Sequence, residues 1–410
     1  MPHSNPSVLK YGGAAVGTLE RLNIVAQDVL AEHRSGHGVV VVVSAMGDET
    51  DELLALVRNV NPGASRTFQD MVVQTGEVKA VGLLAAAIER YGDGNVVAFT
   101  SQQVGFLGSD DRDSARLVQV RGVSLIRRAL AEGKIVIVPG FQAVTSAGSL
   151  VTLGRGGSDL TAVALAVVLK ARCCVFKKDV DGLSPVDPRL VPDALIFEEL
   201  DYDAAKDVAQ DRVLMDRAIS LAQAHGVPLR VVRSPSIGPS TGGTTIRSAS
   251  THEALEPKLQ PITAVSADSN LALVKILGIP DRPGQAMKLF SAVRDVSLND
   301  AIQAEGTGRS AVISFLVSAM RLPDALARIH TVHRSVQGKE GYVALTVFDR
   351  RMRRDPAYLA RVTGALARAR ANISLISTSG PAITVGIKSA DLARGARALA
   401  DEFELRRNVG

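Results

Sequence analysis

Short runs of β-branched and other apolar residues alternate, along residues 8–233, with longer segments whose apolar positions recur at helical spacing. Such an alternation predicts a largely parallel sheet covered by helices on both faces. Sites in sheets of this kind lie at the carboxyl ends of the strands. The predicted strands are 8–11, 39–44, 96–100, 135–138, 175–178 and 229–233, and the predicted helices are 19–33, 70–91, 122–132 and 159–170.

A change of composition marks the end of this region. Residues 234–243 are rich in serine, proline, glycine and threonine, and a polar stretch then continues to Pro261, which is typical of a linker. Beyond it, a pattern of strand, turn, helix and strand occurs from 273 to 298 and again from 344 to 374. We therefore expect two small α/β modules in tandem after the first domain.

Composition narrows the class of protein. With 410 residues, 46% hydrophobic and 22% charged, the chain is long enough for two or three globular domains. The two cysteines, Cys173 and Cys174, are adjacent, so they form neither a disulfide framework nor a metal-ligand spacing, and a reducing cytoplasm is expected. The N-terminus has no basic region followed by an apolar core, which argues against secretion.

Two further classes of partner are not expected. The apolar segment 160–176 contains Lys170 and Arg172, which favours a buried helix running into a strand over a membrane span. The net charge is +5 with arginines crowded at 350–361, but aromatic residues make up only 4% of the chain. Because no stacking pattern accompanies the arginines, we interpret them as a solvated face rather than a nucleic-acid surface.

Three glycine-rich segments, 10–13, 154–159 and 178–182, lie where strands should end. Glycines let backbone N–H groups approach a phosphate closely, and a helix that starts after such a loop directs its positive end at the anion. Lys10 closes the first strand, so its ammonium can reach over the turn at Gly12 and Gly13. By itself this pattern also fits a surface lysine beside an ordinary turn, but together the segments predict a site for phosphoryl transfer.

The second segment supplies side chains for an anionic acceptor. It follows a strand-like run at 150–153 and opens an apolar helix that Ser158 is placed to cap. Arg155 can hold a carboxylate through two hydrogen bonds, and Asp159 can orient a lysine or a metal shell. A tight structural turn is the alternative for this loop taken alone.

Other candidates are less specific. Glu77, on a helical stretch, could pair with a substrate ammonium, although such a glutamate is usually exposed to solvent. Ser44 ends a strand and Thr50 opens the next helix, which also fits simple helix capping. The seven histidines form no Ser-His-Asp or Cys-His arrangement and no pair at metal-ligand spacing, so we expect neither a covalent intermediate nor a protein metal centre.

At this point an ordered set of motifs over essentially the whole chain resembles the aspartate kinases of the amino acid kinase superfamily. The motifs are 10–13 with Val16-Gly17, 41–46 with 50–53, Gly76-Glu77, 139–142, 154–159, 179–189 and, near the C-terminus, 375–379.

The resemblance implies a fold, a reaction and partners. The fold is a three-layer α/β/α sandwich kinase domain over 1–247, followed by ferredoxin-like ACT modules over 261–333 and 341–410. The reaction transfers the γ-phosphoryl group of ATP to the side-chain carboxylate of L-aspartate, with Mg²⁺ held mainly through the nucleotide phosphates. It further implies a cytoplasmic enzyme of amino-acid biosynthesis that forms a homodimer through its ACT modules, with no nucleic-acid or membrane partner. The ACT modules either bind an amino acid effector that regulates the kinase or are purely structural and serve dimerisation.

The resemblance also implies roles by position. The catalytic residues are Lys10, Asp159 and Arg212; the nucleotide contacts are Lys10, Gly12, Gly13, Ser44, Lys178, Asp179, Ser184 and Arg189; and the amino acid contacts are Thr50, Glu77, Arg155, Gly156, Gly157 and Ser158.

The chain departs from the family pattern within the site itself. Two hydroxyls beside the phosphate turn are missing, and other nucleotide-side positions differ. The departures are Ala14, Ala15, Lys178, Ser184, Arg212, Met215 and Asp216, and in the effector region 299–303 and 380–382. An aspartate kinase is the preferred interpretation, and the alternatives are a kinase for another amino acid carboxylate or a weakened amino-acid sensor or regulatory partner.

Overall fold

The chain divides into two compact units. One consists of Met1–Leu183 and Ile196–Leu259, and the other of Ser184–Leu195 and Gln260–Gly410. The computed structural model describes residues 5–92, 95–111, 115–209, 212–240, 242–248, 262–294, 296, 298–305, 310–355 and 357–407. Much of the predicted linker, 249–261, therefore lies outside the described residues.

The first unit is built on an eight-stranded sheet with the order β10-β12-β11-β9-β1-β2-β6-β3. All six strands predicted from the apolar runs are present and pair in parallel. They are β1 (Ser7–Tyr11), β2 (Val39–Val43), β3 (Val96–Ala98), β6 (Ile135–Pro139), β9 (Cys173–Lys178) and β11 (Leu229–Arg233). At the edge, β12 (Thr244–Ile246) pairs antiparallel with β11 and parallel with β10 (Glu199–Leu200).

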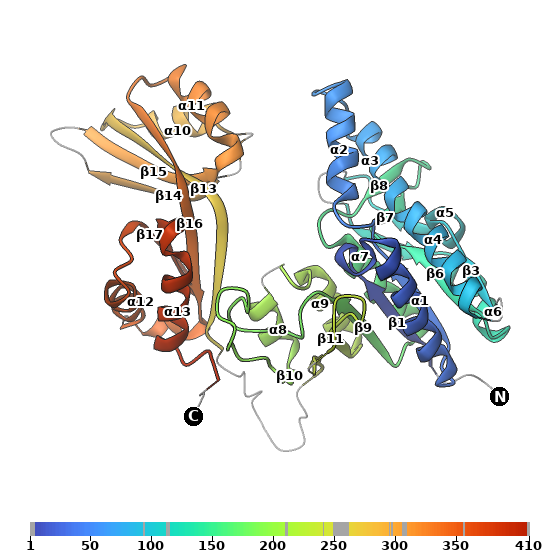
Figure 1. The fold of residues 1–410 in the computed structure, drawn as a ribbon. Coiled ribbons are helices and arrows are strands. Elements are labelled where there is room, and N and C mark those ends of the chain that lie inside the picture. The colour runs from blue at the N-terminus through green and yellow to red at the C-terminus, as the bar shows by residue number, and fades with distance from the viewer. Residues whose placement is uncertain are drawn as a thin grey trace. The chain divides into compact units, whose positions relative to one another are not determined.

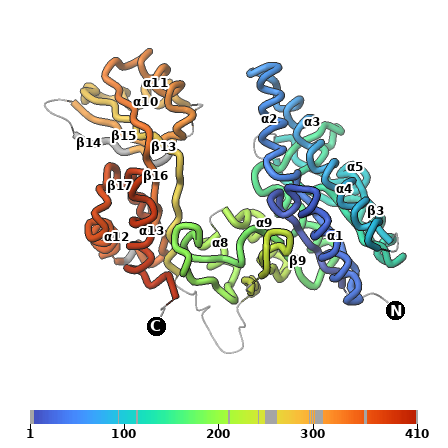
Figure 2. The backbone as a smooth tube through the Cα atoms, viewed as in Figure 1, coloured from blue at the N-terminus to red at the C-terminus, as the bar shows by residue number. Residues whose placement is uncertain are grey.

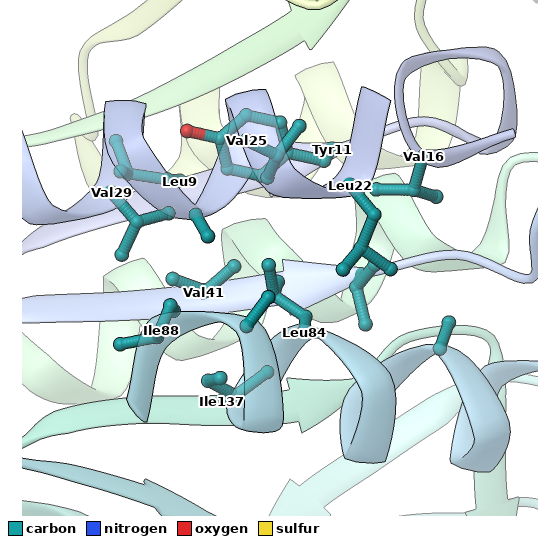
Figure 3. Packing of buried hydrophobic residues seen from close by; sticks show 14 of the residues in the cluster. Leu9, Tyr11, Val16, Leu22, Val25, Val29, Val41, Leu84, Ile88 and Ile137 are labelled. Carbon is teal, nitrogen blue, oxygen red and sulfur yellow. The ribbon is translucent and has the colours of Figure 1, made fainter. Parts of the chain in front are cut away.

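Helices cover both faces of this sheet, as the unbroken apolar strands predict (Figure 1). On one face, α1 (Leu19–Arg34) and α4 (Thr75–Tyr91) pack against β1, β2 and β6, and Leu84 and Ile88 of α4 lie among Leu9, Val41 and Ile137 (Figure 3). The other face is covered by α6 (Val123–Ala131), α7 (Gly157–Leu169) and α9 (Asp216–His225). The predicted three-layer α/β/α architecture is confirmed.

The helix predicted at 70–91 is in fact two helices. A separate helix, α3 (Arg66–Val73), precedes α4, and Gln74 joins them. The side-chain amide of Gln142 donates a hydrogen bond of 2.6 Å to the carbonyl oxygen of Gln74. At this junction the carbonyl therefore has a partner from outside the two helices. Residues Arg66–Tyr91 together are long and apolar enough to cross a membrane, but Leu84 and Ile88 pack inside the sheet layer as in a core helix of a globular domain.

A small second sheet in this unit was not predicted beyond one of its strands. Its order is β5-β4-β7-β8, comprising β4 (Phe106–Gly108), β5 (Leu117–Val120), β7 (Gln142–Val144) and β8 (Leu150–Thr152). The strand β8 leads directly into the loop before α7, so this sheet carries the second glycine-rich segment.

The second unit is a six-stranded antiparallel sheet with helices, as expected for ferredoxin-like modules. The order is β14-β15-β13-β16-β18-β17. One module contains α10 (Gln285–Ala292), β14 (Leu298–Glu305), β15 (Ser310–Ser318) and α11 (Leu322–His330). The other contains α12 (Ala357–Arg368), β17 (Ile373–Ser379), β18 (Ala382–Lys388) and α13 (Leu392–Glu402).

Two long strands serve both modules. β13 (Ala264–Pro280) and β16 (Val336–Phe348) run side by side (Figure 2). The first part of β13, 264–268, pairs with 344–348 beside β18, whereas 271–280 pairs with β15. The register shifts between Asp268 and Leu271, where Asn270 has a φ of 60°. The modules are thus interleaved through their central strands.

The segment Ser184–Leu195 belongs to this second unit, although it follows β9 in the chain. Val186, Val191 and Ala194 are buried in the core formed by β16, β18, α12 and α13. Val186 forms a parallel bridge with Val265, and Asp193 pairs with arginines near the C-terminus. Burial of these apolar residues holds the segment in place.

We expect Leu84→Ala to destabilise the first unit by about 2–5 kcal/mol, because Leu84 is fully buried and its truncation leaves a cavity. Urea unfolding, followed through the transition of this unit, measures the change. Leu56→Ala is the matched control: Leu56, on α2 (Glu49–Val60), is 59% exposed and should shift stability by less than about 0.5 kcal/mol. Equal effects of the two substitutions would contradict the packing.

Candidate active site

The carboxyl ends of neighbouring strands bring the glycine-rich segments together. β1 lies between β2 and β9, and Lys10 and Tyr11 are in register with Phe176 and Lys177. The Gly12 N–H donates to the carbonyl oxygen of Lys177 at 3.4 Å. The turn after Lys10 therefore lies beside Lys178.

The turn at Gly12 and Gly13 packs closely on the loop after β2. A Cβ on Gly13 would lie 2.8 Å from the carbonyl oxygen of Ala45 and 3.0 Å from that of Gly47, so only glycine fits. The Gly47 N–H donates to the Gly13 carbonyl oxygen at 3.0 Å, and the Ser44 N–H donates to Tyr11 at 3.2 Å. The Gly12-Gly13 turn and the loop after β2, which begins with the nucleotide candidate Ser44, thus form one backbone surface.

Two buried serines, Ser234 and Ser236, form a hydrogen-bonded pair that contacts the turn following Gly12. The Ser236 hydroxyl donates to the carbonyl oxygen of Ala15 at 2.7 Å and lies 2.8 Å from the Ser234 hydroxyl. Ala15 belongs to the 3₁₀ turn Gly13–Val16, so these serines hold the turn that follows Gly12 in place. Sequence reasoning assigned Ser234 and Ser236 only to a polar linker; nothing in their spacing signalled this contact.

The loop before α7 uses glycines for conformation and for space. Gly154 and Gly156 have φ values of 76° and 74°, in the left-handed region that favours glycine. The prediction that Ser158 caps the helix is wrong: Gly156 is the N-cap, and Ser158 lies within the first turn against Gly140. The buried hydroxyl of Ser158 is 2.6 Å from where a Gly140 Cβ would be.

A buried carboxylate with two lysines forms the centre of the site. Asp159, in the first turn of α7, lies 2.9 Å from the Lys10 ammonium through Oδ1. The Lys178 ammonium donates to both carboxylate oxygens of Asp159, at 3.1 and 3.0 Å. Burial by itself would raise the pKa of Asp159, but the two ammonium groups outweigh it and the pKa is lowered. Asp159 is therefore ionised and orients both lysines.

Glu77 lies near the loop after β2 in a different electrostatic setting. It is 3% exposed, and its Oε1 accepts a hydrogen bond of 3.2 Å from the Ala45 N–H. Among the described residues its Oε2 has no hydrogen-bond partner. Burial raises the pKa of Glu77 to about 7; Ala45 and Gln142 oppose this rise, and Glu49 adds to it. A buried acid of this kind is suited to receive a cation such as a substrate ammonium.

Gln142 is a site residue that the analysis of the sequence did not single out. Its side chain is buried next to Glu77, with the amide N–H bonded to Gln74. The preceding residue, Phe141, has a φ of 69°, in the left-handed region, so the chain bends sharply just before Gln142. The motif 139–142 was the available signal.

The other predicted residues of the first unit lie on the loops around this centre. Ser44 follows β2, Thr50 is in the first turn of α2, and Arg155 is exposed on the loop before α7. The carbonyl oxygen of Asp179 accepts a hydrogen bond from Arg233, whose guanidinium also binds Asp181.

Arg212 lies in the connection between α8 (Tyr202–Ala209) and α9, and its side chain is exposed. Met215, three residues later, is the nearest side chain to the Cβ position of Gly156. The loop that carries Arg212 thus reaches the glycine turn, while a catalytic role for Arg212 itself stays a prediction.

Ser184 and Arg189 are placed differently from the other nucleotide candidates. Both lie in the segment that belongs to the second unit. The Ser184 hydroxyl donates to the carbonyl oxygen of Val186 at 2.7 Å, and Arg189 pairs with Asp187 at 2.8 Å. Their contact with a nucleoside stays a prediction.

Comparison with known families agrees with the two units. Residues 5–233 match the Amino acid kinase family, and residues 345–403 match an ACT domain. The aspartokinase of Corynebacterium efficiens is 37% identical over 97% of this chain and 96% of its own length.

Solved structures give the same fold. An aspartate kinase from Synechocystis is similar with a TM-score of 0.53 and 33% identity, covering 97% of this chain and 69% of that one. The E. coli aspartokinase III in complex with aspartate and ADP has a TM-score of 0.69 at 21% identity, covering 97% of this chain and 100% of that one. At 21% identity, the similarity to the E. coli structure shows the fold alone.

The raised pKa of Glu77 predicts a pH-dependent stability. Because the folded pKa of about 7 lies above the usual 4.5, the contribution of Glu77 is fully present below pH 4.5 and is lost as the pH rises through 7. Between pH 5 and pH 8, wild type should therefore lose about 2–3 kcal/mol relative to Glu77→Gln. Urea midpoints at the two pH values measure the difference.

Glu89→Gln provides the control for that comparison. Glu89 lies on the same helix, α4, but is exposed, so the substitution should leave the pH dependence of wild type unchanged. A parallel pH dependence of wild type and Glu77→Gln would show that Glu77 titrates normally.

Proposed function

Because this chain belongs to the aspartokinases of the amino acid kinase family, we infer that it transfers the γ-phosphoryl group of ATP to the side-chain carboxylate of L-aspartate, giving an acyl phosphate. The observation that carries the inference is the arrangement of Lys10, Lys178 and Asp159 beside the Gly12-Gly13 turn. Transfer between two anions requires fixed positive charge, because their repulsion opposes their approach.

The phosphate turn and Lys10 act on the nucleotide. The backbone surface of Gly12, Gly13 and Ser44 receives the phosphate oxygens, and the Lys10 ammonium stabilises the charge that moves during transfer. Asp159 holds the Lys10 side chain at this position, since their charged atoms are 2.9 Å apart. Asp179 approaches the nucleoside from the end of β9, and Arg212 adds a positive charge near the Gly156 turn.

The amino acid lies on the other side of the centre. Glu77 receives its ammonium, because a buried acid with an unpartnered oxygen is completed by a cation. Arg155 holds the α-carboxylate, with Thr50, Ser158 and the backbone of Gly156 and Gly157 around it. The side-chain carboxylate then faces the phosphoryl group in line.

Mg²⁺ enters this site with the nucleotide. Phosphate oxygens are the hard ligands that Mg²⁺ prefers, and the ion neutralises part of the triphosphate charge. Within the described parts of the chain, no group of three or more His, Cys, Asp or Glu side chains is arranged to hold a metal.

The second unit provides regulation. An amino acid effector binds at the ACT modules and acts by favouring one state of the kinase unit over another. The modules also join two chains into a homodimer, and the protein works in the cytoplasm. Of the predicted effector contacts, 380–382 lie at the turn between β17 and β18, whereas the side chains of 299, 300, 302 and 303 lie outside the described residues.

A hydroxamate assay tests the reaction. The protein is incubated with MgATP, hydroxylamine and single amino acids, and an acyl phosphate is trapped as its hydroxamate. We expect product with L-aspartate. Product only with a different amino acid would identify another carboxylate as acceptor, and binding of amino acids without any product would identify a sensor instead of a kinase.

We expect Lys10→Ala to lower kcat by about a hundredfold or more, because it removes a group that stabilises the transferring phosphoryl. Lys134→Ala is the matched control: Lys134 precedes β6, has a 40% exposed side chain and pairs with Glu132, so its loss should leave kcat unchanged. Comparable turnover of wild type and Lys10→Ala would remove Lys10 from the mechanism.

A further inference from the structure

Lys178 is the second of two lysines that contact the buried Asp159. It is the last residue of β9, next to the Gly12 turn, and its ammonium contacts both oxygens of Asp159. Asp159 is already paired with Lys10 at 2.9 Å. A single carboxylate thus serves two ammonium groups, and the three side chains together carry one net positive charge.

An excess positive charge in a buried cluster is unfavourable unless an anion completes it. The side chains of Asp159 and Lys10 are 3% and 6% exposed, whereas that of Lys178 is 15% exposed. Lys178 is therefore the member of the cluster that is most open to an arriving ligand. Its ammonium also lies 5.8 Å from the centre of the Phe176 ring, within the range of a cation–π contact.

Resting on the nucleotide binding inferred above, we propose that Lys178 is a second catalytic lysine, which exchanges one Asp159 oxygen for a non-bridging oxygen of the γ-phosphoryl group when ATP binds. Asp159 retains its ion pair with Lys10 throughout. Before the nucleotide binds, Asp159 also holds Lys178 within reach of the γ-phosphoryl position. The extra ammonium supplies positive charge beside a turn that lacks side-chain hydroxyls, because Ala14 and Ala15 follow Gly13.

The pKa of Lys178 is lowered, which is consistent with a positively charged site that an anion can complete. Burial lowers the pKa of Lys178 to about 8; Asp159 opposes this effect and Lys10 adds to it. The groups that face Lys178 are Lys10 from β1, Asp159 from α7 and, on its own strand, Cys174. Arg233 of β11 is in register with Lys178, but its guanidinium is bound to Asp181.

The proposal predicts different effects on two nucleotides. Lys178→Thr should weaken MgATP binding by roughly tenfold to a hundredfold, as for a lost hydrogen bond to a charged group. MgADP, which has no γ-phosphoryl, should lose less than about threefold. Titration calorimetry without amino acid measures both affinities, and Lys178→Arg should retain more ATP affinity than Lys178→Thr because it keeps the charge.

Proton uptake gives an independent readout. A bound triphosphate favours the ammonium form, so ATP binding near pH 8 should take up about half a proton in wild type. Calorimetry in two buffers of different ionisation enthalpy measures this number. Both Lys178→Thr and Lys178→Arg should abolish the uptake, because neither side chain titrates near pH 8.

Lys177→Thr is the matched control. It removes a lysine from the adjacent position of the same strand, where the side chain points to the other face and pairs with Asp28 at 2.9 Å. ATP affinity and proton uptake should then equal those of wild type. Thermal unfolding of each variant checks that the fold is retained.

Equal losses of ATP and ADP affinity in Lys178→Thr, or no loss of either, would overturn the proposal. These outcomes are distinct from failure of the proposed reaction, which the hydroxamate assay of wild type decides. A protein that makes no aspartyl hydroxamate but shows the ATP-specific loss would keep Lys178 as a γ-phosphate contact and lose aspartate as the acceptor.

Discussion

Asp159 is buried at the start of α7 and is bonded to the ammonium groups of Lys10 and Lys178. These residues come from three separate elements, and their contact depends on β1 and β9 being neighbours in the sheet with α7 packed behind them. Because a buried charge is tolerated only with close partners, the cluster ties the register of the strands to the position of the helix. The proposed chemistry rests on that connection.

Two glycines allow backbone segments to pack closely around this cluster. Gly13 permits contact with the loop after β2, and Gly140 leaves room for Ser158 at the start of α7. At each position the missing side chain lets two backbone segments approach closely. The backbone amides and the short side chain of Ser158 can therefore lie near Asp159. Glu77 lies against the loop after β2, and among the described residues its buried Oε2 has no hydrogen-bond partner, which suits it to receive a cation.

In the second unit, the sharing of β13 and β16 makes the two modules one sheet. Both modules therefore depend on the pairing of these two strands. The segment Ser184–Leu195 is built into the same core, although it continues the chain from β9 of the kinase unit. The chain that follows β9 thus contributes apolar residues to the core of the second unit.

The sequence by itself determined the parallel sheet, its central strands and the repeated modules, because unbroken apolar runs and helical periodicity are local properties of the chain. It also placed the glycine turns and Lys10 at strand ends, although Lys10 taken alone fitted a surface lysine beside an ordinary turn equally well. The tertiary structure alone decided that α3 and α4 are separate helices, that Gly156 rather than Ser158 caps α7, and that Ser234 and Ser236 support the phosphate turn. It alone placed Ser184 and Arg189 in the second unit and gave one carboxylate to two lysines. These features arise from contacts between residues that are far apart in the chain, and no local pattern encodes which distant group will satisfy a buried charge or carbonyl.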